Sequence, residues 1–255
     1  MTAGSTLRDW WALIGRAGGG LLFPTACQVC DAETHGSPFC DACGDELRDA
    51  AGSPCHRCAM PMGPFADRTR GCSECRGKAL GFDAAVALGP YTGPIRQFCL
   101  ALKREHNAWM ARWVAELVVE SRAGAIRRAL GPDVGPEPWV VPIPLHWRKR
   151  FRRGYNQAEA LARGVASGMK LPLRQPLRRV VDTPALALAG RPERARRMKE
   201  AFRVARGARL EGRPVLLVDD ILTTGATTGA AARALKKAGA ERVIVVVVGR
   251  AEGRP

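Results

Sequence analysis

The sequence predicts an α/β protein, built on a central, mostly parallel sheet flanked by helices, with a small cysteine-rich module in front of it. The segments VLLVDD and VIVVVV are continuous apolar runs separated by a helical pattern. Such strands are typical of parallel sheets that are buried on both faces. Eight of the nine cysteines lie between Cys27 and Cys75 in CxxC pairs, a spacing that metal-binding modules use.

Composition sets the broad class of the protein. The chain has 255 residues, of which 46% are hydrophobic, enough for one large domain or two ordinary ones. The net charge of +16 favours polyanionic partners, although an Arg-rich surface without such a partner gives the same value. No run of 18 apolar residues occurs, so no membrane span is expected. The paired cysteines indicate a reducing compartment, and we expect a cytoplasmic protein.

Three regions are expected along the chain. Residues 1–26 have the pattern of a short helical arm, and residues 27–78 hold the cysteine pairs among turn-forming residues. The cysteine region has few aliphatic residues and needs metal ions in place of a core. Residues 82–255 carry the apolar patterns of the α/β domain.

The first elements of this domain follow from apolar spacing. A strand that runs into a turn is expected over residues 84–91, and a buried strand ended by prolines over residues 139–144. Apolar residues at helical spacing fill residues 94–130, and the helix is expected to break near His106–Asn107.

The remaining elements end in a strand, helix and strand unit. Asn156 is placed to cap a helix over residues 157–169. The Arg-rich residues 174–200 show no clear period, so they are expected to form either a flexible segment or a short hairpin and helix. The last three elements are expected over residues 215–220, 225–237 and 243–248, with Gly239 ending the helix.

The four CxxC pairs predict structural zinc. Each pair presents two thiolates, and two pairs complete a tetrahedral site with no position open to water. We favour sequential pairing, with the first four cysteines binding one ion and the last four another; cross-braced pairing, one occupied site and a disulfide framework are the alternatives. The eight expected ligands are Cys27, Cys30, Cys40, Cys43, Cys55, Cys58, Cys72 and Cys75. Cys99 falls on an apolar helix face and is interpreted as a core residue.

The segment VLLVDDILTTGATTG predicts a sugar-phosphate site. An apolar strand ends in Asp219 and Asp220, and a turn of small and hydroxyl residues then leads into a helix. Ligands of open α/β sheets bind where strands end, and the start of a helix offers N–H groups to a phosphate. The two carboxylates suit sugar hydroxyls or a magnesium ion. The alternative is a plain strand-to-helix turn with a threonine cap.

This segment resembles the phosphoribosyl pyrophosphate signature of type I phosphoribosyltransferases. More closely, the whole chain resembles the ComF family of competence-associated proteins. The similar stretches are the cysteine pairs, YTGPIRQFCLALK, VVPIPLHWRKRFRRGYNQAEALA and DDILTTGAT. The resemblance covers the chain from about residue 20 to about residue 250. It implies a type I phosphoribosyltransferase fold behind a zinc-ribbon module.

The resemblance also implies roles for single residues. Asp219 and Asp220 would hold the ribose hydroxyls at the catalytic centre, and the following loop would wrap the 5-phosphate. The implied residues of this loop are Ile221, Leu222, Thr223, Thr224, Gly225, Ala226 and Thr227. The loop PLHWRK would bind the pyrophosphate, with magnesium, and the motif RRGYNQ would line the same cleft. Their implied residues are Pro144, His146, Arg148, Lys149, Arg153 and Asn156, for which a solvated basic run is the alternative.

The chain departs from the family pattern in the segment that would form the mobile flap. Leu186 and Arg197 stand where the family usually has Gln and Asn. Thr223 stands where purine-salvage relatives have a carboxylate, which makes a 6-oxopurine acceptor less favoured. No residue stands out as a general base, and His146 is the weak candidate.

Two functions remain open from the sequence. One is an enzyme that transfers the phosphoribosyl group to a nitrogen acceptor, linked by family resemblance to DNA uptake. The other is an adaptor that binds phosphoribosyl pyrophosphate or a nucleotide without turnover. Such an adaptor would contact single-stranded DNA, or a helicase-like competence protein, through its zinc ribbon and basic surface.

Overall fold

The computed structural model describes residues 26–34, 36–63, 65–66, 71–132, 135–181 and 200–252. Within these ranges, four side chains are not described: His106, Lys149, Arg152 and Arg153. The expected helical arm over residues 1–26 lies outside the described residues except for Ala26. Residue contacts divide the chain into two compact units, Met1–Glu46 and Leu47–Pro255. The second group of four cysteines therefore belongs to the same unit as the sheet.

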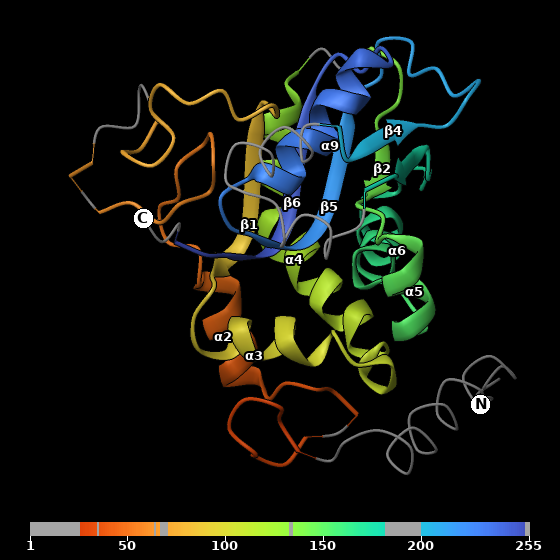
Figure 1. Cartoon of the computed structure of the whole chain (residues 1–255). Coiled ribbons are helices and arrows are strands. Elements are labelled where there is room, and N and C mark those ends of the chain that lie inside the picture. The colour runs from red at the N-terminus through yellow and green to blue at the C-terminus, as the bar shows by residue number, and fades with distance from the viewer. Residues whose placement is uncertain are drawn as a thin grey trace, which may run out of the picture. The chain divides into compact units, whose positions relative to one another are not determined.

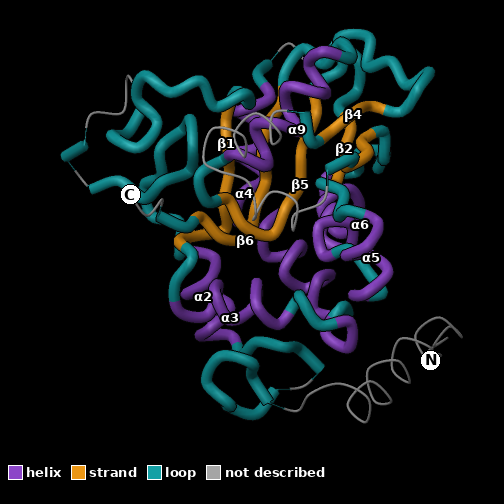
Figure 2. The backbone as a smooth tube through the Cα atoms, viewed as in Figure 1, coloured by secondary structure: helices purple, strands orange, loops and turns teal. Residues whose placement is uncertain are grey.

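A four-stranded sheet forms the centre of the larger unit (Figures 1 and 2). Its strands are β1 (Ala84–Pro90), β2 (Trp139–Pro142), β5 (Val215–Leu222) and β6 (Val243–Arg250), in the spatial order β1-β6-β5-β2. All three neighbouring pairs are parallel. Every residue of β6 and the first four residues of β5 are buried. The continuous apolar runs thus have the cause expected for them, burial on both faces of the sheet.

Helices cover both faces of this sheet. On one face, α4 (Met110–Leu130) packs against β1 and β6, and α6 (Gln157–Met169) packs against β5, β2 and α4. On the other face, α9 (Ala226–Lys237) packs against β5 and β6 (Figure 1). The apolar core between α9 and the sheet includes Val215, Leu217, Ala231 and Leu235.

Smaller elements complete the described chain. They are α2 (Asp41–Asp49), α3 (Gly93–Ala101), the 3₁₀ turn Glu105–Asn107, α5 (Trp147–Arg153), β3 (Leu177–Arg179) and β4 (Phe202–Val204). Strands β3 and β4 pair antiparallel, and both contact α9. No helix among the described residues is long and apolar enough to cross a membrane.

The structure confirms the expected order of elements. The helix capped by Asn156 has the predicted bounds, because the Asn156 side chain accepts a hydrogen bond from the Ala158 N–H and Lys170 ends the helix in the left-handed conformation. The break expected near His106–Asn107 is the 3₁₀ turn between α3 and α4. Cys99 is fully buried, as expected for a core residue. The fold class predicted from the sequence is therefore confirmed.

Two helices were not expected from the sequence. α2 begins within the second cysteine pair and contains Cys43, in a segment interpreted only as turns. α5 takes up Trp147–Arg153, so the second half of the predicted loop PLHWRK is the first turn of a helix. The expectation of an open loop is correct only for Pro144–His146, and wrong for residues 147–149. Trp147 and Phe151 lie four positions apart in α5, but two apolar residues among basic ones are too short a pattern to predict a helix.

The start of α9 packs closely against the chain that leads into β1. A Cβ atom on Gly229 would overlap the carbonyl oxygen of Leu80, so only glycine fits this crossing. We predict that Gly229→Ala lowers the free energy of unfolding by about 1–3 kcal/mol, since backbone must shift to admit the methyl group. Urea unfolding measures this change.

The matched control is Gly124→Ala on the exposed face of α4. There the nearest atom to the new Cβ is the Arg128 guanidinium, at 3.4 Å. Alanine is the better helix former, so this variant should be as stable as the original protein or more stable by about 0.5–1 kcal/mol. Equal stabilities for the two variants would show that the Leu80 crossing does not constrain the helix.

Candidate functional site

The connections of the sheet reverse direction between β2 and β5. After β2, the chain passes through α6 and adds a parallel bridge at Leu173 on the outer side of β2. Backbone hydrogen bonds hold this bridge, from Val140 N–H to Pro172 O and from Arg174 N–H to Val140 O, both 2.9 Å. After β5, the chain passes through α9 to β6, on the opposite side. Ligands of open α/β sheets bind at such a reversal, outside the carboxyl ends of the two strands.

Both phosphate-binding segments expected from the sequence begin at this place. β2 and β5 are hydrogen-bonded neighbours, with Pro142 opposite Val218. Beyond the last pair, the Ile143 N–H donates to the Val218 carbonyl at 2.9 Å. The structure therefore brings the segment from Pro144 and the segment from Asp219 to adjacent strand ends.

The two aspartates lie near the carboxyl end of β5. Asp219, Asp220 and Ile221 are half-buried, although the preceding four residues are fully buried. The Asp219 carboxylate accepts a hydrogen bond from the Asp220 N–H at 3.0 Å. Burial, and then the nearby charge of Asp220, raise the pKa of Asp219 well above its ordinary value, while Arg179 acts in the opposite direction. The two aspartates are therefore partly accessible, and ionisation of Asp219 costs free energy. A hydrogen-bond donor or a cation bound beside them would lower this cost.

The turn that follows is exposed and begins a helix. Thr223, Thr224 and Ala226 are exposed, so the described side chains leave this turn accessible. Gly225 has a φ of 78°, the left-handed conformation that glycine adopts without strain. Helix α9 starts at Ala226, and the N–H groups of its first turn have no carbonyl partner in a preceding turn. This geometry suits a bound phosphate.

Side-chain hydroxyls hold the turn in shape. The Thr224 hydroxyl accepts a hydrogen bond from the Ala226 N–H at 3.4 Å, and the Thr228 hydroxyl donates to the Gly225 carbonyl at 3.2 Å. Thr228 is buried, while Thr227 is only half-buried. The Thr228 hydroxyl therefore stabilises the start of the helix.

On the β2 side, Asn156 has a structural position. It is buried, its side-chain N–H donates to the Ile143 carbonyl at 3.1 Å, and its oxygen caps α6. Asn156 thus ties the start of α6 to the residue that follows β2. The His146 side chain is buried at the start of α5, whereas Arg148 is exposed. The side chains of Lys149 and Arg153, expected at the pyrophosphate, are outside the described residues.

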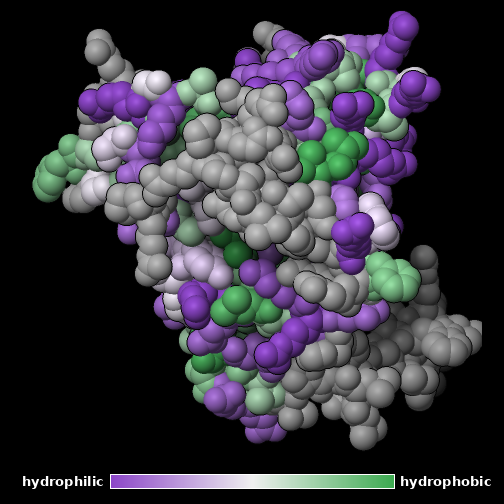
Figure 3. Space-filling view, in the orientation of Figure 1, coloured by the Kyte–Doolittle hydropathy of each residue, from purple (hydrophilic) through white to green (hydrophobic). Residues whose placement is uncertain are grey.

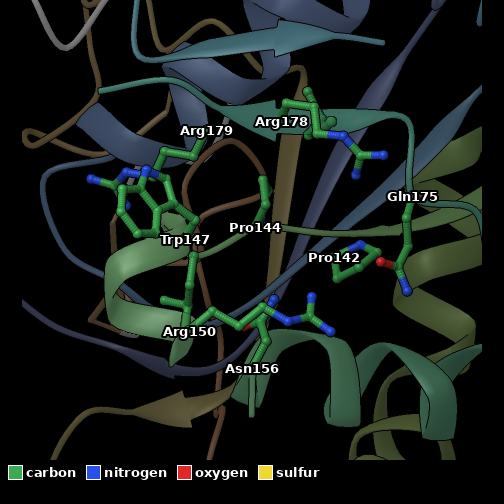
Figure 4. A pocket seen from close by; sticks show the side chains of 10 residues that line it. Pro142, Pro144, Trp147, Arg150, Asn156, Gln175, Arg178 and Arg179 are labelled. Atoms are coloured by element: carbon green, nitrogen blue, oxygen red, sulfur yellow. The ribbon is translucent and has the colours of Figure 1, made fainter. Parts of the chain in front are cut away.

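A cavity of about 180 Å³ opens beside this strand end (Figure 4). Arg178 and Arg179 reach it from β3, and Trp147 and Arg150 reach it from α5. Pro142, Pro144, Leu145, Asn156, Gln175 and Leu177 line the rest. Arg150 forms an ion pair with Glu159 at 3.3 Å. The cavity lining therefore contains three arginines, one aromatic wall and no acidic residue, at the end of β2.

Hydrophilic side chains dominate the described part of the surface in Figure 3, where apolar side chains form only small, separate groups. α5 carries two of the large apolar side chains that are exposed, Trp147 with 66% of its surface open and Phe151 with 90%. The Arg148 guanidinium lies over the Trp147 ring, 5.2 Å from its centre. Exposed aromatic rings with adjacent cations are suited to stack on bases.

The cysteines form two groups, each from two successive CxxC pairs. The thiol sulfurs of Cys27, Cys30, Cys40 and Cys43 lie within 4.8 Å of one another, and so do those of Cys55, Cys58, Cys72 and Cys75. This confirms the sequential grouping; the cross-braced alternative is wrong. Four thiolates fill a tetrahedral zinc site and leave no position for water, so both groups suit structural zinc.

Backbone N–H groups favour one thiolate in each cysteine group. Burial opposes ionisation of Cys55, but N–H groups of Cys72, Cys58 and Arg57 lower its pKa to about 7. The Cys72 N–H, for example, lies 3.4 Å from the Cys55 sulfur and donates to it. In the first group, burial likewise opposes the N–H groups around Cys27, which lower its pKa to about 6. Ionised thiols are the form that binds zinc.

Two residues of the site were not identified from the sequence. Arg179 belongs to the Arg-rich segment, which has no clear pattern. Its electrostatic interaction with Asp219 depends on the β3–β4 pairing. Arg250 is 6% exposed and bonded to the carbonyls of Leu222 and Thr223. The signal in the sequence is that Arg250 directly follows the apolar run VIVVVVG. A charged side chain buried at that position needs hydrogen-bond partners. The flap residues Thr183 to Arg197 lie outside the described residues.

Comparisons with known proteins agree with this architecture. A profile described as "Phosphoribosyl transferase domain" matches residues 158–254, and one described as "Double zinc ribbon domain" matches residues 20–76. "Competence protein F" of Haemophilus influenzae is 27% identical over 229 residues, which cover 88% of this chain and 90% of that protein.

Further relatives carry a second name. "DNA utilization protein YhgH" of Salmonella typhi is 28% identical over 229 residues, covering 88% of this chain and 96% of that protein. The protein of the same name from Escherichia coli K12 is 26% identical, covering 81% and 88%. The crystal structure of TT1426 from Thermus thermophilus has a TM-score of 0.32 and 22% identity, covering 56% of this chain and 81% of that chain.

Proposed function

The chain belongs to the ComF family, which joins a double zinc ribbon to a phosphoribosyl transferase domain, and from this membership we propose that it binds phosphoribosyl pyrophosphate at the carboxyl ends of β2 and β5. The observation that carries the proposal is the open turn after Asp220. It joins two half-buried carboxylates to the start of a helix at the point where the sheet connections reverse. Carboxylates accept hydrogen bonds from ribose hydroxyls, and the helix start receives the 5-phosphate.

The cationic cavity beside α5 suits the other end of the same ligand. Arg178 and Arg179 lie on its β3 side, and α5 lies on the other (Figure 4). A guanidinium group can donate two parallel hydrogen bonds to two oxygens of one phosphate. It keeps its positive charge throughout the physiological pH range. Magnesium bound with the ligand would screen the diphosphate charge. The ribose carbon C1 would then lie between the aspartate pair and the cavity.

The reaction that fits this arrangement is transfer of the phosphoribosyl group to a nitrogen acceptor. The bond between C1 and the pyrophosphate oxygen breaks, the bond between C1 and the acceptor nitrogen forms, and pyrophosphate leaves. The side chains hold the two ends of the ligand and neutralise the charge that develops on the leaving group. Calorimetric titration with phosphoribosyl pyrophosphate and magnesium tests the site. Pyrophosphate release with a panel of nitrogen heterocycles tests turnover.

A second candidate function is binding without turnover, in an adaptor that contacts single-stranded DNA. The observation that favours it is α5, where Trp147 and Phe151 are exposed beside arginines. The net charge of +16 and the names of the relatives agree with a polyanionic partner. Ligand binding without pyrophosphate release for any acceptor would favour this function. A gel shift at low salt that Trp147→Ala with Phe151→Ala abolishes would support the DNA contact.

Affinity for phosphoribosyl pyrophosphate should depend on pH through Asp219. Its pKa is raised, so its carboxyl remains partly protonated at pH values where an ordinary aspartate is ionised. The ionised form accepts the hydroxyl hydrogen bonds, so affinity should rise as the pH increases through this raised pKa. Phosphates of the ligand also titrate near pH 6. The ratio of affinities for the original protein and Asp219→Asn, measured across pH, isolates the aspartate; a constant ratio would contradict the prediction.

A further inference from the structure

Arg250 connects the second cysteine group to the phosphate turn. It is the last residue of β6, and its side chain is buried. Its Nε donates to the Cys58 carbonyl at 2.8 Å. Its Nη1 donates to the Leu222 carbonyl at 3.0 Å and to the Thr223 carbonyl at 2.7 Å, and it also contacts the Ala251 carbonyl. One guanidinium therefore bonds at the same time to a zinc-ligand residue and to the start of the turn.

These bonds determine which way the peptide groups of the turn face. A trans peptide is planar, so its N–H points opposite to its carbonyl. Because the Leu222 and Thr223 carbonyls face Arg250, the N–H groups of Thr223 and Thr224 face away from it. Both of these threonines are exposed. Arg250 thus holds the two N–H groups toward the open side of the turn, where an anion would bind, and adds a positive charge behind them.

The chain that leaves the second cysteine group makes a second connection, to helix α9, which begins directly after the phosphate turn. Arg57 donates to the carbonyls of Cys75 and Lys78, at 3.1 and 3.2 Å, and so holds the segment that follows the last cysteine. This segment then crosses α9 where Gly81 and Gly229 allow close backbone approach. The buried Phe82 ring lies against Gly225, the residue that directly precedes α9.

The cysteine group is small and depends on its own metal for shape. Its buried residues are the four cysteines and Met60, with Met62 and Leu80 against them. Such a cluster is too small to fix the Cys58 carbonyl in place without the bonds from four sulfurs to one ion. The position of this carbonyl, and of the guanidinium bonded to it, therefore depends on the metal.

We propose that Arg250 couples metal binding at the second cysteine group to the geometry of the phosphate turn, so that loss of this metal weakens ligand binding at Thr223–Thr227. The inference rests on the proposed function for the identity of the ligand, and on hydrogen bonds alone for the coupling. Arg250 acts as a positioning residue, since it holds the turn from behind. The first cysteine group lies in the other compact unit and has no part in this coupling.

Two arginine variants of the full chain test the role of the side chain. Calorimetry with phosphoribosyl pyrophosphate and magnesium should show affinity weakened roughly tenfold or more in Arg250→Met, because charge-assisted hydrogen bonds to the turn are lost. Arg250→Lys keeps the charge but has fewer donors and should lie between. The matched control is Arg122→Met, since Arg122 is half-buried and donates to the Arg48 and Leu88 carbonyls, both 2.7 Å, away from the turn. It should bind as the original protein does.

Two cysteine variants test the role of the metal. Cys72→Ser with Cys75→Ser empties the second group, and Cys27→Ser with Cys30→Ser empties the first; metal content confirms each loss. Affinity for phosphoribosyl pyrophosphate should fall in Cys72→Ser with Cys75→Ser and stay unchanged in Cys27→Ser with Cys30→Ser. Because coupling is reciprocal, saturating ligand should raise the zinc affinity of the second group by the same factor, measured by competition with a chelator.

Hydrogen exchange separates this inference from the proposed function. The amides of residues 222–228 should exchange faster in Arg250→Met and in the second-group variant, with no ligand present. Unchanged exchange in both variants would overturn the coupling, even if the ligand binds. Faster exchange without any binding of phosphoribosyl pyrophosphate to the original protein would keep the coupling and reject the proposed ligand.

Discussion

Replacing Asp219 and Asp220 together by asparagine is expected to lower the affinity for phosphoribosyl pyrophosphate by about 10- to 100-fold. Each carboxylate is proposed to accept a hydroxyl hydrogen bond from the ribose, and a hydrogen bond to a charged group contributes about 1.5–3 kcal/mol. Asparagine keeps a neutral acceptor oxygen, whose hydrogen bond contributes about 0.5–1.5 kcal/mol, so the two substitutions together lose roughly 2 kcal/mol, or about 30-fold in affinity. Calorimetry with magnesium measures the change.

The same double variant should not be less stable than the original protein. The raised pKa of Asp219 shows that burial and the charge of Asp220 disfavour its ionised form in the fold. Asparagine removes this repulsion, so the melting temperature should stay the same or rise. The control is Asp83→Asn. Asp83 directly precedes the edge strand β1, and the substitution removes the negative charge of its 2.6 Å ion pair with Lys236. Affinity equal to that of the original protein in the double variant would remove the site assignment.

Loss of metal from the second cysteine group is expected to lower the melting temperature of the larger unit strongly. Structural zinc contributes about 10–16 kcal/mol of binding free energy, and a Cys₄ group without it has little core of its own. The second group shares the larger unit with the sheet, and the carbonyl of Cys58 is bonded to Arg250 of β6. The chain from Cys55 to Cys75 should become sensitive to protease in Cys72→Ser with Cys75→Ser.

The first cysteine group provides the comparison for this prediction. Cys27→Ser with Cys30→Ser should expose residues of the first unit to protease and leave the melting of the larger unit almost unchanged. Calorimetric melting of both variants, with metal content measured in each, distinguishes the two effects. Equal decreases in melting temperature would contradict the separate roles given to the two groups.

Much of the fold was predictable because its signals are local. Asn156 is followed by a helical pattern that runs to Met169, so the bounds of α6 follow from one cap and from apolar spacing. The two cysteine groups follow from CxxC spacing and from the short gaps between pairs. The strands β5 and β6 follow from apolar runs that only burial on both faces explains.

The rest depends on which distant segments meet. The reversal between β2 and β5 exists only once the strand order is known, and the bridge at Leu173 has no strand pattern of its own. α5 is a short helix of charged and aromatic residues, and its one apolar pair, Trp147 and Phe151, is too short a pattern to predict it. Arg250 reaches Cys58, 192 positions earlier in the chain, and nothing in the sequence around either residue predicts that contact.

The position of β6 also constrains the order in which the protein can fold. β6 follows the other three strands along the chain, yet it lies between β1 and β5 and pairs with both. Ala84 pairs with Ile244, so this contact closes a loop that contains most of the larger unit. During synthesis, the edges of β1 and β5 that pair with β6 therefore stay unpaired until β6 leaves the ribosome. Slow, late closure of the sheet follows from this topology.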